Sequence, residues 1–173
     1  MDSRELTRIM KSERSTATIF KGVFPADYFI DVVPSYPAAY IVNTDSHDKP
    51  GKHWVALYLT SNGHCEFFDS YGHPPQYYHH AWLDWIKYYS YKWTYNQKHI
   101  QPTYSATCGL HCLFYIYHRC QGMTLKTIQS LFSNNLPLND VIAEEDLESH
   151  ILEDIIIEDS TFFINQLCSS LIE

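Results

Sequence analysis

A cysteine at the head of an apolar run is the residue of this chain whose type and position most suggest chemistry. Cys108 lies in the stretch QPTYSATCGLHC, and the apolar residues after it predict a buried helix over 108–120. The first turn of a helix favours a thiolate, because unpaired backbone N–H groups and the helix dipole stabilise negative charge there. Gly109 leaves room beside the sulfur for a substrate backbone. Cys108 is therefore a candidate nucleophile, and the alternatives are a buried structural thiol or, with Cys112, a pair of metal ligands.

A thiolate nucleophile requires a proton acceptor, commonly a histidine, and a group that orients the imidazole. Of the ten histidines, His53 opens the apolar strand HWVALYLT, and Asp69 ends the next run, HCEFFDS. Asn62-Gly63 between these runs predicts a hairpin turn. His53 and Asp69 then lie at the same end of neighbouring antiparallel strands, where their side chains can meet. The alternative for His53 is an ordinary polar residue at a strand end, and the alternative for Asp69 is a residue that forms a turn.

Gln101 stands seven residues before Cys108, in a loop that Pro102 stiffens. An amide beside the nucleophile can donate a hydrogen bond to the oxyanion that develops on a carbonyl, together with the backbone N–H of Cys108. Without such a neighbour, Gln101 is an ordinary loop residue. Gln101 is therefore the fourth candidate site residue.

The remaining elements form an α+β pattern, with a small mixed or antiparallel sheet packed against helices. Ser3 is the expected cap of the first helix, and Thr124 that of a later one. The stretch 20–37, with three prolines, predicts loops and extended structure. The sequence predicts strands over 38–44, 53–60, 64–70 and 92–97, and helices over 3–13, 74–91, 108–120 and 125–132.

Composition limits the class of protein. The chain has 173 residues, of which 45% are hydrophobic, so we expect one globular domain over 1–173. A net charge of −8 argues against binding nucleic acid over the whole surface. No apolar stretch approaches the roughly 20 residues of a membrane span. The charged start MDSRELTRIMKSER predicts an intracellular protein that is not secreted, and the five cysteines are then reduced thiols.

The C-terminal segment 140–173 predicts an acidic helical tail packed on the domain. Nine acidic residues lie between Asp140 and Asp159. We interpret this charge run as a solvated helical face and prefer that interpretation to a binding tail.

The candidate residues lie in motifs that resemble one family. The stretches YIVNT, GKHWVALYL, FFDSYG and QPTYSATCGLHC, in this order, resemble the adenovirus-type (adenain-like) cysteine proteases of DNA viruses and virus-like mobile elements. The wider clan includes the proteases specific for SUMO and ubiquitin-like modifiers. The resemblance covers roughly residues 19–120. Each motif is short, but four of them in order at suitable spacing make a specific signal.

The resemblance implies a papain-like clan arrangement, with the nucleophile at the N-terminus of a central buried helix. It implies Cys108 as nucleophile, His53 as general base and acid, Asp69 as its orienting partner and Gln101 as oxyanion donor. It also implies that Trp54 lines the cleft. The implied activity is that of an endopeptidase, without a cofactor, which cleaves viral or element-encoded precursor proteins after small residues such as glycine. The implied location is the host nucleus or the virus particle.

Two departures from the human adenovirus enzymes bear on regulation. No cysteine lies between Cys65 and Cys108, which argues against a disulfide-linked activating peptide. The acidic balance of the chain argues against DNA as a cofactor. Within the clan, the seven-residue step from Gln101 to Cys108 is adenovirus-like, whereas an Asp at position 69 is the acid that SUMO proteases use.

Three alternatives remain open at this point. The same catalytic set suits an isopeptidase that removes ubiquitin or a ubiquitin-like modifier. A binding module that has lost catalysis is the second, although the candidate set is complete. The third is a zinc site in which Cys108 and Cys112 act with Cys120 and with His111 or His118, although this spacing matches no common zinc motif.

Overall fold

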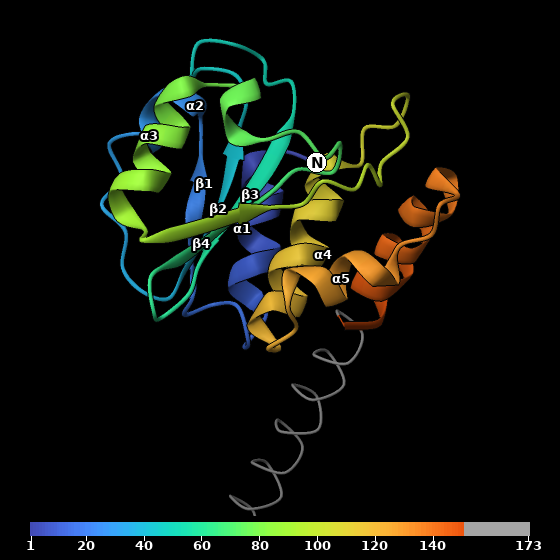
Figure 1. The fold of residues 1–173 in the computed structure, drawn as a ribbon. Helices are drawn as coiled ribbons and strands as arrows, with labels where there is room; N and C mark the ends of the chain where they lie inside the picture. Colours follow the sequence, from blue (N-terminus) through green and yellow to red (C-terminus); the bar gives the residue numbers. More distant parts are fainter. Residues whose placement is uncertain (151–173) are drawn as a thin grey trace, which may run out of the picture.

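The apolar runs of the sequence form the centre of a five-stranded sheet in the computed structural model, which describes residues 1–150 (Figure 1). The central strands β2 (Ala38–Asn43), β3 (Trp54–Leu59) and β4 (His64–Phe68) are antiparallel. β1 (Phe20–Phe24) pairs with β2, and β5 (Lys92–Tyr95) pairs with β4, both in parallel. The sheet order is β1-β2-β3-β4-β5. The predicted α+β class with a mixed sheet is confirmed.

Helices cover both faces of this sheet (Figure 1). One face carries α1 (Ser3–Ser12), α4 (Cys108–Cys120) and α5 (Leu125–Leu131). The other face carries α2 (Ala26–Phe29) and α3 (His80–Tyr89).

Alternate residues of β2 show why the central runs are apolar without interruption. Ala39 and Ile41 belong to the core on the α4 side, whereas Tyr40 and Val42 belong to the core on the α3 side. All four residues are buried. A strand that is covered on both faces has no position at which a polar side chain would reach water.

The bounds of α4 agree with the prediction, and so does its end at Gln121-Gly122, where Gly122 takes a φ of +89°. α5 begins as predicted, because Thr124 Oγ1 accepts a hydrogen bond from the Thr127 N–H at 3.1 Å. The hairpin at Asn62-Gly63 is also present.

Two predicted helices differ in the structure. The cap of α1 is Asp2 and not Ser3, because the Asp2 carboxylate accepts from the N–H groups of Arg4 and Glu5 at 2.8 and 2.9 Å. The predicted helix over 74–91 is divided into a 3-10 turn, Pro75–Tyr77, and α3. Adjacent prolines at 74 and 75 give the start of this segment no backbone N–H donors. The short helix α2, within the predicted loop region, was not expected.

Residues 136–150 form a further helix beside α4 and α5 (Figure 1). Ala143 is fully buried, and Ile142 and Leu147 pack against the core on the α4 side. Glu144 and Glu145 are exposed, as expected for a solvated acidic face. The rest of the predicted tail, 151–173, lies outside the described residues. Within residues 1–150, no helix has the length and apolar character needed to cross a membrane.

Candidate active site

Three of the predicted site residues meet where α4, β3 and β4 come together. Cys108 is the first residue of α4, His53 directly precedes β3, and Asp69 directly follows β4. His53 Nε2 lies 2.6 Å from Asp69 Oδ1. The Cys108 thiol and the His53 ring are close enough for each group to shift the pKa of the other. Because Asp69 engages Nε2, Nδ1 is the ring nitrogen that remains for the sulfur, and the three side chains form a triad.

The electrostatics of the triad favour an ion pair between Cys108 and His53. Burial opposes charge on His53, but the hydrogen bonds and charges of Asp69 and Cys108 raise its pKa to about 9. Burial likewise opposes a thiolate at Cys108, but His53 and the backbone N–H groups of Trp54 and Gly109 lower its pKa below the ordinary value. Both shifts favour a thiolate at Cys108 next to an imidazolium at His53.

Asp69 is fully buried, and its carboxylate oxygens accept several hydrogen bonds besides that of His53. Oδ1 accepts from the Tyr71 N–H at 3.1 Å. Oδ2 accepts from the His73 N–H at 2.9 Å and from the Tyr78 hydroxyl at 3.0 Å. Burial would raise the pKa of Asp69, but His53 and these N–H donors lower it. The carboxylate is therefore held ionised and in one orientation.

Asn96 fixes the backbone of Asp69, a role that was not predicted from the sequence. Its Oδ1 accepts from the Asp69 N–H at 2.7 Å, and its Nδ2 donates to the Asp69 carbonyl at 2.6 Å. Asn96 follows β5 and is fully buried. The only signal in the sequence was an asparagine at the end of the predicted strand over 92–97, which is also typical of a turn.

The turn after Asp69 depends on a glycine and places an aromatic ring on His53. Gly72 has a φ of +79°, and a Cβ atom there would lie 3.0 Å from the Gln97 carbonyl oxygen. Tyr71 stacks on the His53 ring, with the ring centroids 4.7 Å apart. The motif FFDSYG therefore supplies the acid, one of its N–H donors and a wall for the imidazole.

Gln101 lies beneath the site and is fully buried. Its Oε1 accepts from the Ser70 hydroxyl at 2.6 Å, and its Nε2 donates to the Ser105 carbonyl at 2.9 Å. A primary amide has two N–H donors, and the Ser105 carbonyl accepts from one of them. Unlike Cys108 and Trp54, Gln101 does not line either of the two cavities around His53 described next.

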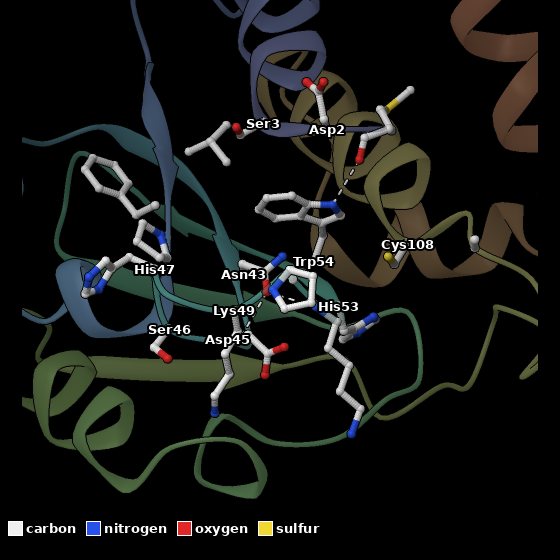
Figure 2. Close-up of a pocket in the computed structure, with 18 of the residues that line it drawn as sticks. Asp2, Ser3, Asn43, Asp45, Ser46, His47, Lys49, His53, Trp54 and Cys108 are labelled. Atoms are coloured by element: carbon white, nitrogen blue, oxygen red, sulfur yellow. Dashed lines mark hydrogen bonds between the residues drawn. The ribbon is translucent and has the colours of Figure 1, made fainter.

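A cavity of about 610 Å³ opens beside the triad and has Trp54 in its wall (Figure 2). The indole Nε1 donates to the Met1 carbonyl at 3.3 Å. A second cavity, of about 470 Å³, lies on the side of His53 that carries the aromatic residues. Its lining includes His73, Tyr77 and Tyr78. Both cavities border His53 and share Asp45, Lys52 and Tyr71 in their lining.

The surroundings of Gly109 differ from the expected free space for a substrate backbone. A Cβ atom at this position would lie 3.3 Å from Leu6 Cδ2 and 3.3 Å from Trp54 Cδ1. The room that the missing side chain leaves is thus taken by these two side chains, because α4 packs closely against α1 and the start of β3. What Gly109 presents to the sulfur of Cys108 is its backbone N–H.

The ligands considered for zinc are engaged elsewhere. Cys112 is fully buried in the core, as the alternative of a packed thiol predicts. His111 and His118 pair with Asp140 and Asp146, at 2.9 and 3.2 Å. Within residues 1–150, no three His, Cys, Asp or Glu side chains gather as metal ligands would.

The geometry thus defines a class, that of cysteine hydrolases with a Cys-His-Asp triad on an α+β fold. The sequence model of the adenovirus endoprotease family matches residues 18–169, and the chain belongs to this family. The match extends beyond the motif region 19–120 into the C-terminal third.

Similar proteins are found in a virus and in a bacterium. A cysteine protease of African swine fever virus is 31% identical over 93 residues, which cover 49% of this chain and 34% of the relative. The chain thus spans about a third of that relative's length. The crystal structure of the African swine fever virus protease matches with a TM-score of 0.47 and 22% identity, over 64% of this chain and 44% of the other. The central domain of an uncharacterized Legionella pneumophila protein matches with a TM-score of 0.46 and 17% identity, over 87% of this chain and 98% of the other.

Proposed function

We propose that this chain is a cysteine endopeptidase that cleaves precursor proteins of a virus or virus-like element after small residues such as glycine. The observation that carries the proposal is the arrangement of Cys108 beside His53, whose ring in turn lies 2.6 Å from Asp69. Membership of the adenovirus endoprotease family supports the same chemistry. The two cavities that border His53 offer space for a polypeptide substrate and support the proposal.

In the first half of the reaction, the Cys108 thiolate attacks the carbonyl carbon of the scissile peptide and forms a C–S bond. The negative charge moves to the carbonyl oxygen, for which the second N–H of Gln101 and the Cys108 backbone N–H are the proposed donors. The imidazolium of His53 then gives its proton to the leaving amine nitrogen, and the C–N bond breaks. A thioester with the enzyme remains, and the amine product departs.

In the second half, neutral His53 accepts a proton from water as the water oxygen attacks the thioester carbonyl. The C–S bond breaks, the carboxylic acid product leaves, and the thiolate–imidazolium pair is restored. Asp69 stabilises the imidazolium in both halves without taking a proton, because hydrogen bonds from several donors keep its pKa low.

A peptide library with small residues around the scissile bond tests this proposal, with cleavage sites identified by mass spectrometry. We expect cleavage by the wild-type chain and none by Cys108→Ala, with unchanged circular dichroism. Ubiquitin and SUMO probes that carry a thiol-reactive C-terminus form the second arm. If these probes label Cys108 rapidly and no library peptide is cleaved, the isopeptidase alternative replaces the endopeptidase proposal.

A further inference from the structure

A second His–Asp pair lies at the start of α4, outside the triad. His111 is fully buried one turn after Cys108, and its Nε2 lies 2.9 Å from Asp140 Oδ1. Burial lowers the pKa of His111, although Asp140 acts in the opposite direction. Its Nδ1 is also buried and has no hydrogen-bond partner among residues 1–150. The neutral ring therefore carries its proton on Nε2 and donates it to Asp140.

Asp140 also holds the residue directly before the nucleophile. Its Oδ1 accepts from the Thr107 hydroxyl at 2.8 Å. The Thr107 and Ser105 hydroxyl oxygens lie 2.9 Å apart, and the Ser105 carbonyl is the acceptor for Gln101 Nε2. Contacts of Thr107 and Ser105, joined by the covalent structure of Ser105, thus connect Asp140 to Gln101 through the loop over 101–107.

The neighbouring residue, Asn139, holds the other end of the same loop. Asn139 is fully buried, and its Nδ2 donates to the Ile100 carbonyl at 2.8 Å. Its Oδ1 accepts from the Ser133 N–H at 2.7 Å, which fixes the amide in this orientation. Two successive residues of helix 136–150 therefore contact the chain just before Gln101 and just before Cys108. The loop between these ends is irregular, and Thr103, Tyr104 and Ala106 within it are exposed.

We propose that Asn139 and Asp140 are positioning residues of the active site. From helix 136–150 they hold both ends of the 101–107 loop, and thereby place Gln101 and the backbone N–H groups at the head of α4. The acidic C-terminal segment then has a solvated face and also contributes to the alignment of the nucleophile. This inference rests on the proposed function, because the alignment matters for attack on a carbonyl.

The chain offers a matched control for this proposal. His118 Nε2 lies 3.2 Å from Asp146 Oδ2, so a second His–Asp pair joins the same two helices two turns further along α4. The Asp146 pair stabilises the packing of the helices but has no connection to the 101–107 loop in these hydrogen bonds. If the His111–Asp140 pair only stabilised the packing of the helices, substitutions in it and in the His118–Asp146 pair would have the same effects.

The experiment compares Asp140→Asn with Asp146→Asn in the full chain. We expect Asp140→Asn to lower kcat by about tenfold or more, with KM within about twofold, because misplacement of reacting groups by about 1 Å can cost 100-fold. Asp146→Asn should leave kcat unchanged below its melting temperature. Thr107→Val should reproduce the loss, because it removes the hydroxyl but keeps the shape, and Thr107→Ser should retain activity.

Hydrogen exchange of the backbone N–H groups over 101–107 provides a readout that needs no substrate. We expect exchange about tenfold faster in Asp140→Asn than in the wild type, and unchanged exchange in Asp146→Asn. Equal kcat and equal loop exchange in the two variants would overturn the positioning role. If the wild-type chain cleaves no peptide, the proposed function fails, and the exchange comparison still decides whether Asp140 orders the loop.

Discussion

Asp69→Asn tests the electrostatics of the site, because it removes one charge and keeps the size of the side chain. In the structure, the carboxylate accepts from His53 and from Tyr71, His73 and Tyr78. The introduced NH₂ group is itself a hydrogen-bond donor, and it would face one of these donors in place of an acceptor. The imidazolium of His53 would lose its counter-charge, and the Cys108 thiolate would in turn lose part of the charge that stabilises it.

The magnitude follows from the pKa of His53. The pKa of His53 is about 9, against an ordinary value of 6.5. The site therefore favours the imidazolium by roughly 3 kcal/mol, to which Asp69 and Cys108 both contribute. A charge-assisted hydrogen bond is worth about 1.5–3 kcal/mol. We therefore expect kcat/KM at neutral pH to fall by about 10- to 150-fold.

The pH dependence separates this effect from a general loss of structure. Cleavage by the wild type should rise as Cys108 ionises, below its ordinary pKa, and fall near pH 9 as His53 loses its proton. In Asp69→Asn the alkaline limb should move to lower pH. The control is Glu66→Gln, which changes another buried carboxylate, one that accepts from Arg119 at 2.7 Å. An alkaline limb that stays near pH 9 in Asp69→Asn would refute the reasoning.

Three further substitutions separate chemistry from packing. Cys112→Ala should keep cleavage activity and cost about 1 kcal/mol of stability in denaturant unfolding, because it leaves a small cavity in the core. If Cys112→Ala were inactive while Cys108→Ala remained active, the assignment of the nucleophile would be refuted. Asn96→Ala should lower both kcat and stability, the latter by about 1–3 kcal/mol, because buried backbone groups of the triad acid lose their partner, and unchanged kcat would contradict its positioning role. Arg119→Leu should cost about 3–5 kcal/mol in the same unfolding assay by leaving the buried charge of Glu66 without a counter-charge, and a loss below 1 kcal/mol would contradict the pairing.

The triad could be predicted from the sequence because its parts follow from local patterns. The hairpin turn fixes which ends of β3 and β4 lie together, and this brings His53 and Asp69 to 2.6 Å. The apolar run after Cys108 marks the start of α4 at the observed residue. A turn signal and hydrophobic patterns are enough for these placements.

The supporting residues could not be predicted, because they reach the site through long-range contacts. Asn96 contacts Asp69 across 27 residues, and Asp140 contacts Thr107 across 33 residues. Neither position stands out from the usual asparagines and aspartates of turns and helix surfaces. The surroundings of Gly109 were also inaccessible, because they depend on where α1 packs.

Alkylation by iodoacetamide at about pH 6, followed by mass spectrometry, tests the central claim that Cys108 is an activated thiolate. Cys120 is the decisive comparison, because it is more exposed than Cys108 but burial raises its pKa to about 12. Exposure alone would favour Cys120, whereas the triad favours Cys108. We predict that Cys108 is alkylated well before Cys120 and that His53→Ala removes this preference. Faster labelling of Cys120 in the wild-type chain would contradict the account.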